Sequence, residues 1–176
     1  GWRDILKWMR NLLKGFWLVF RLWGRYPEWL LLEVGIAKPG DMEALKRWVQ
    51  PDVVVVTAFG ETPAHVEFFE SKEAVWEEEA RIIEALKPDG VLVLNHDDPR
   101  VLALRKGVRR PVLTYGFSEE ADIRLEHYEP VIDRYGLPEG IRFRVNYDGK
   151  SLPVHLGGVI GKSFVYYAGA SLAVMR

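Results

Sequence analysis

The chain has 176 residues, no cysteine and a formal net charge of −1. Its apolar fraction of 48 % is enough for one substantial core and argues against a disordered chain. The lack of cysteine excludes disulfides, thiolate metal ligands and cysteine nucleophiles, and it favours an intracellular protein. The nearly neutral total charge indicates neither a nucleic acid nor an acidic partner.

A basic, tryptophan-rich segment opens the chain. Residues 1–25 contain six basic side chains and one acidic one, so the segment carries about +5 although the whole chain carries −1. Apolar residues fill most of the positions between the basic ones. Five basic residues recur at steps of three, four or seven, which places them along one stripe of a helix: Arg3, Lys7, Arg10, Lys14 and Arg21. The pattern predicts an amphipathic helix over 1–25.

Two interpretations of this helix stay open. Its longest uncharged run, Gly15 to Phe20, is too short to span a bilayer, and no small-residue cleavage site follows it. A basic stripe beside tryptophan-rich faces is typical of a helix that lies on a membrane surface. The same helix could instead pack on another domain or a partner, with its basic stripe in water.

Short apolar runs alternate with helical patterns from residue 26 onward. Continuous Val and Leu runs predict strands that are buried on both faces, over 29–34, 52–57, 90–95 and 111–115. Helices are predicted near 41–49, 71–86 and 99–106, with Asp41, Ser71 and Asp98 as caps. The alternation predicts right-handed βαβ units, hence a three-layer α/β domain with a parallel sheet.

The pattern changes after Gly116. Polar and apolar residues alternate over 122–128, 141–147 and 151–156, and Asp148-Gly149 lies between the last two runs as a tight-turn signal. An alanine-rich helix follows Gly161. We therefore expect a small antiparallel extension of the parallel sheet.

Two candidate metal ligands follow neighbouring strands. Glu33 ends the first predicted strand, and His65 lies in the loop after the second. Open α/β sheets place their ligand sites at the carboxyl ends of parallel strands, so both side chains are expected to face one crevice. Each also has an ordinary interpretation, Glu33 as an ion-paired or capping residue and His65 as a polar surface group.

Several motifs follow one another in a fixed order: 26–35 (YPEWLLLEVG), 38–41 (KPGD), 51–57 (PDVVVVT), 63–69 (PAHVEFF), 94–99 (LNHDDP) and 114–117 (TYGF). Together they resemble the Mur ligases, most closely the branch that adds D-alanyl-D-alanine. The resemblance covers residues 26–176 and implies a central, ATP-binding domain of the P-loop NTPase type, incomplete at both ends.

The resemblance implies a cytoplasmic ATP-dependent amide ligase of peptidoglycan synthesis. Such enzymes phosphorylate a carboxylate of a UDP-muramoyl peptide with ATP, and an amine, here D-alanyl-D-alanine, then displaces the phosphate. Mg²⁺ would neutralise charge on the phosphates. No nucleic acid is expected as a partner, and contact with the inner membrane surface would come from residues 1–25.

The family's site residues fall on four positions of this chain. Glu33 and His65 match its magnesium-binding glutamate and histidine, and Asn95 matches the asparagine that recognises adenine. Glu79 occupies the position of a carbamoylated lysine that binds a second Mg²⁺, although it could equally belong to a solvated helix face. No catalytic residue is assigned. Asp97 and Asp98 are expected to cap the following helix.

The chain also departs from the family. The glycine-rich phosphate loop, G-x-x-x-x-G-K-[ST], should precede the first matched strand, and residues 1–28 do not contain it. Ala58, Ser163 and Tyr167 replace asparagine, histidine and asparagine of the family pattern, and the closing C-terminal domain has no counterpart. We expect the chain alone not to turn over.

Two other functions remain open. A folylpolyglutamate or cyanophycin synthetase relative would share the fold and the phosphate chemistry. A non-catalytic scaffold at the membrane surface, with a degenerate nucleotide fold, is favoured by the missing phosphate loop and by Glu79. It is disfavoured by the joint presence of Glu33, His65 and Asn95.

Overall fold

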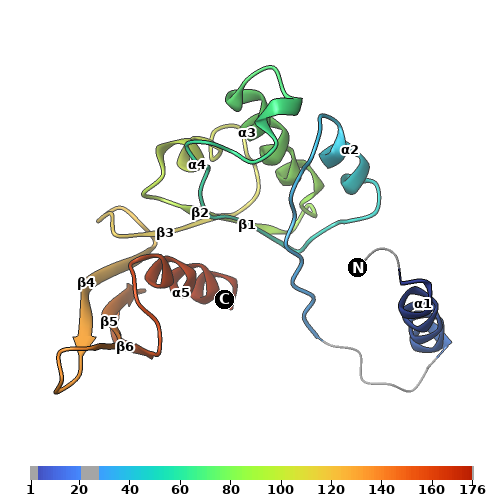
Figure 1. Cartoon of the computed structure of the whole chain (residues 1–176). Coiled ribbons are helices and arrows are strands. Elements are labelled where there is room, and N and C mark those ends of the chain that lie inside the picture. Colours follow the sequence, from blue (N-terminus) through green and yellow to red (C-terminus); the bar gives the residue numbers. More distant parts are fainter. Residues whose placement is uncertain (1–3, 21–27, 176) are drawn as a thin grey trace. The chain divides into compact units, whose positions relative to one another are not determined.

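The computed structural model describes residues 4–20 and 28–175 (Figure 1). The chain forms two compact units, Gly1–Val34 and Gly35–Arg176. The first unit contains α1 (Ile5–Phe20), which begins after Asp4, whose Oδ1 accepts a hydrogen bond from the Lys7 N–H at 3.2 Å. This confirms the predicted helix over its described part. The predicted domain boundary after residue 25 lies outside the described residues.

The predicted strand over 29–34 is wrong. These residues form neither helix nor strand, and Leu30 and Leu31 are 77 % and 93 % exposed. An apolar run becomes a strand only where a neighbouring strand completes its hydrogen bonds. The described sheet consists of β1–β6 and offers this segment no such partner. The composition of the segment alone could not show that it would have no partner strand.

The second unit is built on a six-stranded sheet in the order β1-β2-β3-β4-β5-β6. Parallel pairing joins the first four strands: β1 (Val53–Val56), β2 (Val91–Asn95), β3 (Val112–Gly116) and β4 (Ile123–Ile132). The strands β5 (Pro138–Tyr147) and β6 (Lys150–Gly157) continue the same sheet in antiparallel pairing. This confirms a parallel α/β sheet with an antiparallel extension.

Helices cover both faces of the sheet, which gives three layers (Figure 1). Alternating strand residues decide which face each side chain joins. Leu92 and Leu94 pack on the face covered by α3 (Lys72–Ala80), the 3₁₀ turn η2 (Arg81–Ala85) and α4 (Pro99–Ala103). Val93 and Tyr115 pack on the opposite face, against α5 (Ser163–Val174). Every one of these four core side chains is fully buried.

A smaller cluster joins α2 (Asp41–Lys46) to α3. Ile36 and Met42 pack with Val75 there, beside the short 3₁₀ turn η1 (Val66–Phe68). The expected caps of α3 and α4 are confirmed: Ser71 Oγ accepts from the Ala74 N–H, and Asp98 Oδ1 accepts from the first turn of α4.

The expected cap of α2 is wrong. Gly40, at φ 87°, precedes the helix, and Asp41 accepts from the N–H groups of Ala37 and Lys38 in the turn before it, at 2.9 and 3.0 Å. These backbone donors hold the pKa of Asp41 below its usual value.

The helices end earlier than expected. Helices α2 and α4 end at Lys46 and Ala103, and α3 ends at Ala80, after which η2 continues it as a 3₁₀ turn. Among the described residues no helix is long and apolar enough to cross a bilayer.

Candidate functional site at the carboxyl ends of the parallel strands

Asn95 joins the ends of two parallel strands. It is the last residue of β2 and is 8 % exposed. Its Nδ2 donates to the Thr57 carbonyl just after β1 at 2.9 Å, and its Oδ1 accepts from the Asp97 N–H at 3.0 Å. The amide therefore fixes two loops at the edge where open α/β sheets hold ligands. One Nδ2 hydrogen and one Oδ1 lone pair remain beyond these two bonds.

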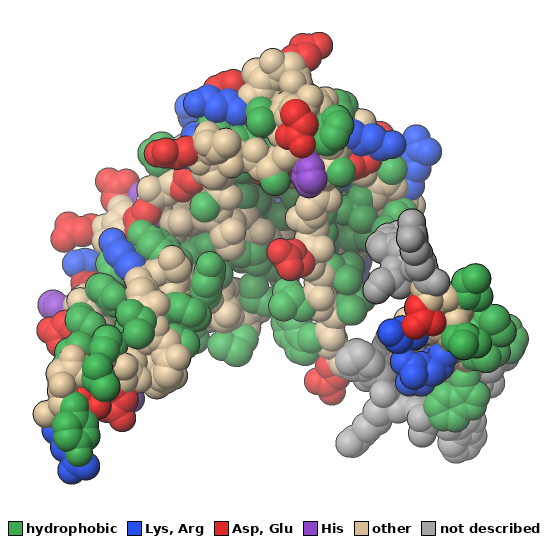
Figure 2. Space-filling model, viewed as in Figure 1, with side chains coloured by type: hydrophobic (Ala, Val, Ile, Leu, Met, Phe, Trp, Pro, Cys, Tyr) green, Lys and Arg blue, Asp and Glu red, His purple; other side chains and the backbone are tan. Residues whose placement is uncertain are grey.

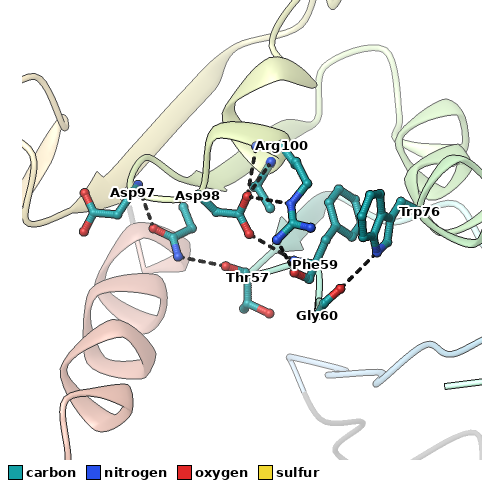
Figure 3. A network of polar contacts seen from close by, with 9 residues as sticks. Thr57, Phe59, Gly60, Trp76, Asp97, Asp98 and Arg100 are labelled. Carbon is teal, nitrogen blue, oxygen red and sulfur yellow. Dashed lines mark hydrogen bonds and ion pairs between the residues drawn. The ribbon is translucent and has the colours of Figure 1, made fainter. Parts of the chain in front are cut away.

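A second set of contacts holds the loop after β1 (Figure 3). Asp98 Oδ2 accepts from the Phe59 N–H at 3.2 Å, and Arg100 donates to the Phe59 carbonyl at 3.0 Å. The guanidinium carbon of Arg100 lies 4.5 Å from the ring centre of Trp76, whose Nε1 donates to the Gly60 carbonyl at 3.2 Å. Sequence reasoning did not identify Trp76 or Arg100, because their partners lie in another loop and leave no local spacing signal.

Asp97 does not cap α4, which corrects the expectation. Its carboxylate accepts from the backbone N–H groups of Phe117 and Ser118 at 2.6 and 2.9 Å, and from the Tyr166 hydroxyl at 2.8 Å. Gly116 leaves room for this carboxylate, since a Cβ there would lie 2.6 Å from Asp97 Oδ1. Asp97 therefore ties the end of β3 to α5.

Two tyrosines next to this carboxylate stay protonated. Burial and then the hydrogen bond to Asp97 raise the pKa of Tyr166 far above its usual value. Burial, followed by the charge of Asp97, does the same to the pKa of Tyr115. The Tyr115 hydroxyl is fully buried and has no hydrogen-bond partner among the described residues.

His65 lies where the sequence predicted it, in the connection between β1 and α3. It precedes η1 with a φ of 62°, and its side chain is exposed, with the ring centre 6.3 Å from that of Phe68. A positive φ costs free energy in a residue other than glycine, and such residues cluster at functional sites. His127 and Asp148 also adopt positive φ values, so the metal-binding role of His65 stays a prediction from the motif.

The run Glu77-Glu78-Glu79 on α3 contains three different environments. Glu77 is exposed, whereas Glu78 is 5 % exposed and accepts from the N–H groups of Gly40 and Met42. Glu79 is half-buried, and desolvation raises its pKa. A carboxylate that is partly desolvated and has no hydrogen bond or ion pair to another described residue can still accept a cation.

Glu33 belongs to the first unit, in the segment without regular structure, and its side chain is exposed. The crevice that we expect Glu33 and His65 to share therefore stays a prediction. Within residues 4–20 and 28–175, no three His, Asp or Glu side chains converge as a metal site. Mg²⁺ in phosphate-transfer sites is commonly held by one or two carboxylates together with phosphate oxygens, so such a convergence is not required.

Comparison with known proteins decides the family. The model of the Mur ligase middle domain matches residues 20–175. The chain belongs to this family. The match covers the parallel sheet, the antiparallel extension and α5.

Curated Mur ligases of two specificities are similar to this middle domain. The UDP-N-acetylmuramoyl-tripeptide–D-alanyl-D-alanine ligase of Bacillus subtilis is 33 % identical over 99 residues, 56 % of this chain and 21 % of the relative. The UDP-N-acetylmuramate–L-alanine ligase of Halorhodospira halophila is 42 % identical over 88 residues, 49 % of this chain and 17 % of the relative. The matched part is thus about a fifth of each relative.

Solved Mur ligases share the fold. The MurF ligase of Thermotoga maritima in complex with ADP superposes with a TM-score of 0.69 at 30 % identity, over 90 % of this chain and 35 % of that one. MurF of Acinetobacter baumannii gives a TM-score of 0.68 at 21 % identity, over 81 % and 29 %. These matches confirm the expected Mur ligase central-domain fold.

Three positions at which the sequence predicts a departure from the family pattern lie in two parts of the second unit. Ala58 follows Thr57 in the loop after β1, and Ser163 begins α5. Tyr167, one turn further, is exposed and packs edge-on against Phe164, with ring centres 5.8 Å apart. Whether these residues replace functional groups of the family stays a prediction.

Proposed function

We propose that this chain is the nucleotide-binding part of an ATP-dependent amide ligase of peptidoglycan synthesis. The ligase would join D-alanyl-D-alanine to a UDP-linked muramoyl peptide in the cytoplasm, where nucleotide-linked precursors are made. The activity is proposed for a protein that contains this chain together with the regions that its relatives have outside it. For the chain alone we expect no turnover.

The observation that carries the proposal is the position of Asn95. It ends β2 at the ligand-binding edge of the sheet and is held by Thr57 and the Asp97 N–H. Its remaining donor and acceptor suit the edge of a base such as adenine. The similar Thermotoga ligase was solved with ADP, which supports nucleotide binding by a protein of this fold.

Metal binding would fall to Glu33, His65 and Glu79. The donor chemistry fits Mg²⁺, because carboxylate oxygens are its preferred ligands and few protein ligands are needed beside phosphate oxygens. The half-buried carboxyl of Glu79 adds a negative charge that water screens incompletely. The bound cation would neutralise phosphate charge, while the loop contacts of Asp98 and Arg100 keep the strand ends in place.

The amino-acid specificity has a second candidate. The 42 % identity to an L-alanine-adding ligase favours L-alanine as the amine and UDP-N-acetylmuramate as the acceptor. The D-alanyl-D-alanine assignment is preferred because both the Bacillus relative and the Thermotoga structure belong to that branch.

The test is an activity assay on the full-length protein. It is incubated with ATP and Mg²⁺ and with each pair of acceptor and amine, and phosphate release and the new amide are measured. We expect turnover with the UDP-muramoyl tripeptide and D-alanyl-D-alanine. Turnover with UDP-N-acetylmuramate and L-alanine would transfer the chain to the other branch, and turnover with a folate or an acidic peptide would favour the synthetase alternative. A full-length protein that neither binds nor hydrolyses ATP would contradict the proposal and support a scaffold.

A further inference from the structure

We infer that α1 is a docking surface for an anionic membrane. The inference concerns the first unit of the chain and goes beyond the proposed ligase activity. Helix α1 carries its charged and its apolar side chains on different sides. The groups that this surface would recognise are the phosphate-bearing headgroups of lipids.

The described side chains of α1 divide into two faces. At 3.6 residues per turn, the polar residues fall within about 100° of the helix circumference: Lys7, Arg10, Asn11 and Lys14. The opposite side of the helix carries apolar residues alone, and Trp17 lies at the border beside Arg10: Ile5, Leu6, Trp8, Met9, Leu12, Leu13 and Phe16. Figure 2 shows basic side chains gathered on one side of this helix and apolar ones on another.

Both faces are solvent-accessible within the described structure. Leu6 is 78 % exposed and Leu12 is 66 % exposed. The only described acidic residue near the helix start is Asp4, which pairs with Lys7 at 3.1 Å. Helix α1 itself contains no acidic residue, so its polar face is positively charged along its length.

Charge selects the occupant of this surface. An interfacial helix buries its apolar half among acyl chains while its flanking cations meet anionic headgroups. Each basic residue near an anionic surface contributes about 1 kcal/mol, equivalent to roughly a fivefold gain in partitioning. The long Lys and Arg side chains at the border of the apolar face can reach anionic headgroups, whereas a neutral apolar groove on a protein would gain nothing from these charges.

The experiment measures binding of the full 176-residue chain to vesicles by co-sedimentation. We expect binding to phosphatidylcholine vesicles that contain phosphatidylglycerol, and weak binding to pure phosphatidylcholine. Raising the ionic strength from about 0.1 M to about 1 M shortens the screening length from about 10 Å to about 3 Å and should release much of the bound protein.

Two variants separate charge from apolar burial. Lys7→Gln with Arg10→Gln and Lys14→Gln should weaken partitioning on the order of a hundredfold. The matched control, Arg105→Gln with Lys106→Gln and Arg109→Gln, removes the same charge from exposed positions of the second unit and should bind normally. Met9→Gln with Leu12→Gln should abolish binding, whereas Ile160→Gln, exposed between β6 and α5, should not.

The same variants also distinguish a membrane from other binding partners of the apolar face. Equal binding to both kinds of vesicle, or equal loss in the charge variant and its control, would overturn the proposal. So would an apolar variant that leaves vesicle binding unchanged but lowers the thermal stability of the chain, which would indicate packing of α1 on protein. A dimer in sedimentation that the apolar variant dissociates, without lipid binding, would assign the face to a second copy.

Discussion

The carboxylate of Glu78 accepts a hydrogen bond from the backbone N–H of Gly40 at 2.9 Å, across 38 positions of the chain. The same oxygen accepts from the Met42 N–H at 3.0 Å, and the other oxygen lies 3.4 Å from Arg81. A side chain of α3 therefore accepts hydrogen bonds from the free N–H groups at the start of α2 and offsets the partial positive charge there. An N-cap residue ordinarily has this role. Glu78 joins two helices that have few other polar contacts.

Replacing Glu78 should destabilise the fold. Glu78→Ala leaves two backbone N–H groups near the start of α2 without their acceptor, at a cost of about 2–3 kcal/mol in the free energy of unfolding. Glu77→Ala, at an exposed position of the same helix, should stay within about 0.5 kcal/mol of the wild type. Denaturant unfolding of both variants measures the difference. Equal effects would mean that the buried bonds contribute nothing of their own.

Removing the Tyr166 hydroxyl should loosen α5. Tyr166→Phe deletes the donor to Asp97 and should cost about 1.5–3 kcal/mol, because the acceptor is charged. Tyr167→Phe is the matched control, since that side chain is exposed. Hydrogen exchange should report faster exchange of the α5 amides in the first variant alone. Unchanged exchange would mean that the hydrogen bond between Tyr166 and Asp97 contributes nothing to holding α5 in place.

Asn95 combines a structural role with the proposed binding role. Asn95→Ala removes the bonds to Thr57 and Asp97 and should lower the free energy of unfolding by about 1–3 kcal/mol. In the full-length ligase it should raise KM for ATP more than it lowers kcat, because adenine contacts bind the ground and transition states alike. Asn146→Ala on β5 controls for loss of an amide elsewhere. An unaltered KM would leave Asn95 with its structural role alone.

Glu79 should make stability depend on pH. Burial raises the pKa of this carboxyl above 4.5, the value expected without the fold, so the folded state binds its proton more tightly. The contribution of Glu79 to the free energy of unfolding is fully present below about pH 4.5. It is lost as the pH rises through the pKa that Glu79 has in the folded state. Glu79→Gln should therefore stabilise the chain at neutral pH and have little effect in acid. Thermal unfolding across the pH range checks this, and Glu77→Gln should show no such trend.

The proposed metal ligands can be tested without disturbing the fold. Glu33→Gln and His65→Gly should each abolish Mg²⁺-dependent acyl-phosphate formation in the full-length ligase. Glu33 is exposed, and glycine adopts the φ of 62° at position 65 without strain, so stability should change by no more than about 1 kcal/mol. Near-normal activity in either variant, measured as phosphate transfer, would contradict the proposal that the replaced residue binds the metal.

Local patterns in the sequence predicted the strands and turns well. The run ending at Asn95 is a buried strand, because its continuous apolar side chains pack under helices on both faces of the sheet. The run ending at Val56 also forms a strand, but only Val54 of it is buried, since β1 is an edge strand of the described sheet. Asp148 and Gly149 adopt φ values of 50° and 70°, as the tight hairpin requires. Asp98 caps α4 because the whole motif, the accepting carboxylate and the donating N–H groups of Arg100 and Val101, lies within three residues.

Long-range contacts were not predictable in the same way. Asp97 and Asp98 are adjacent acidic residues, yet the carboxylate of Asp97 binds groups 20 to 69 positions away, whereas Asp98 caps its own helix as well as binding the Phe59 N–H. Likewise the sequence pointed to Glu79, and the buried acceptor is Glu78. Which of two neighbours turns inward depends on elements that meet only after folding. The run at 29–34 failed for the related reason that strand formation needs a partner.

The two faces of the sheet become complete at different times during synthesis on the ribosome. The core between the sheet and helices α3 and α4 uses residues between Val54 and Val112, so it can close while the remaining chain is still being made. The opposite core needs Val165 and Ala173 of α5. Since the ribosome adds about 5–20 residues per second, several seconds pass between the synthesis of Val93 and Tyr115 and the synthesis of helix α5, which covers them. During that interval the nascent chain presents a bare apolar sheet face to chaperones.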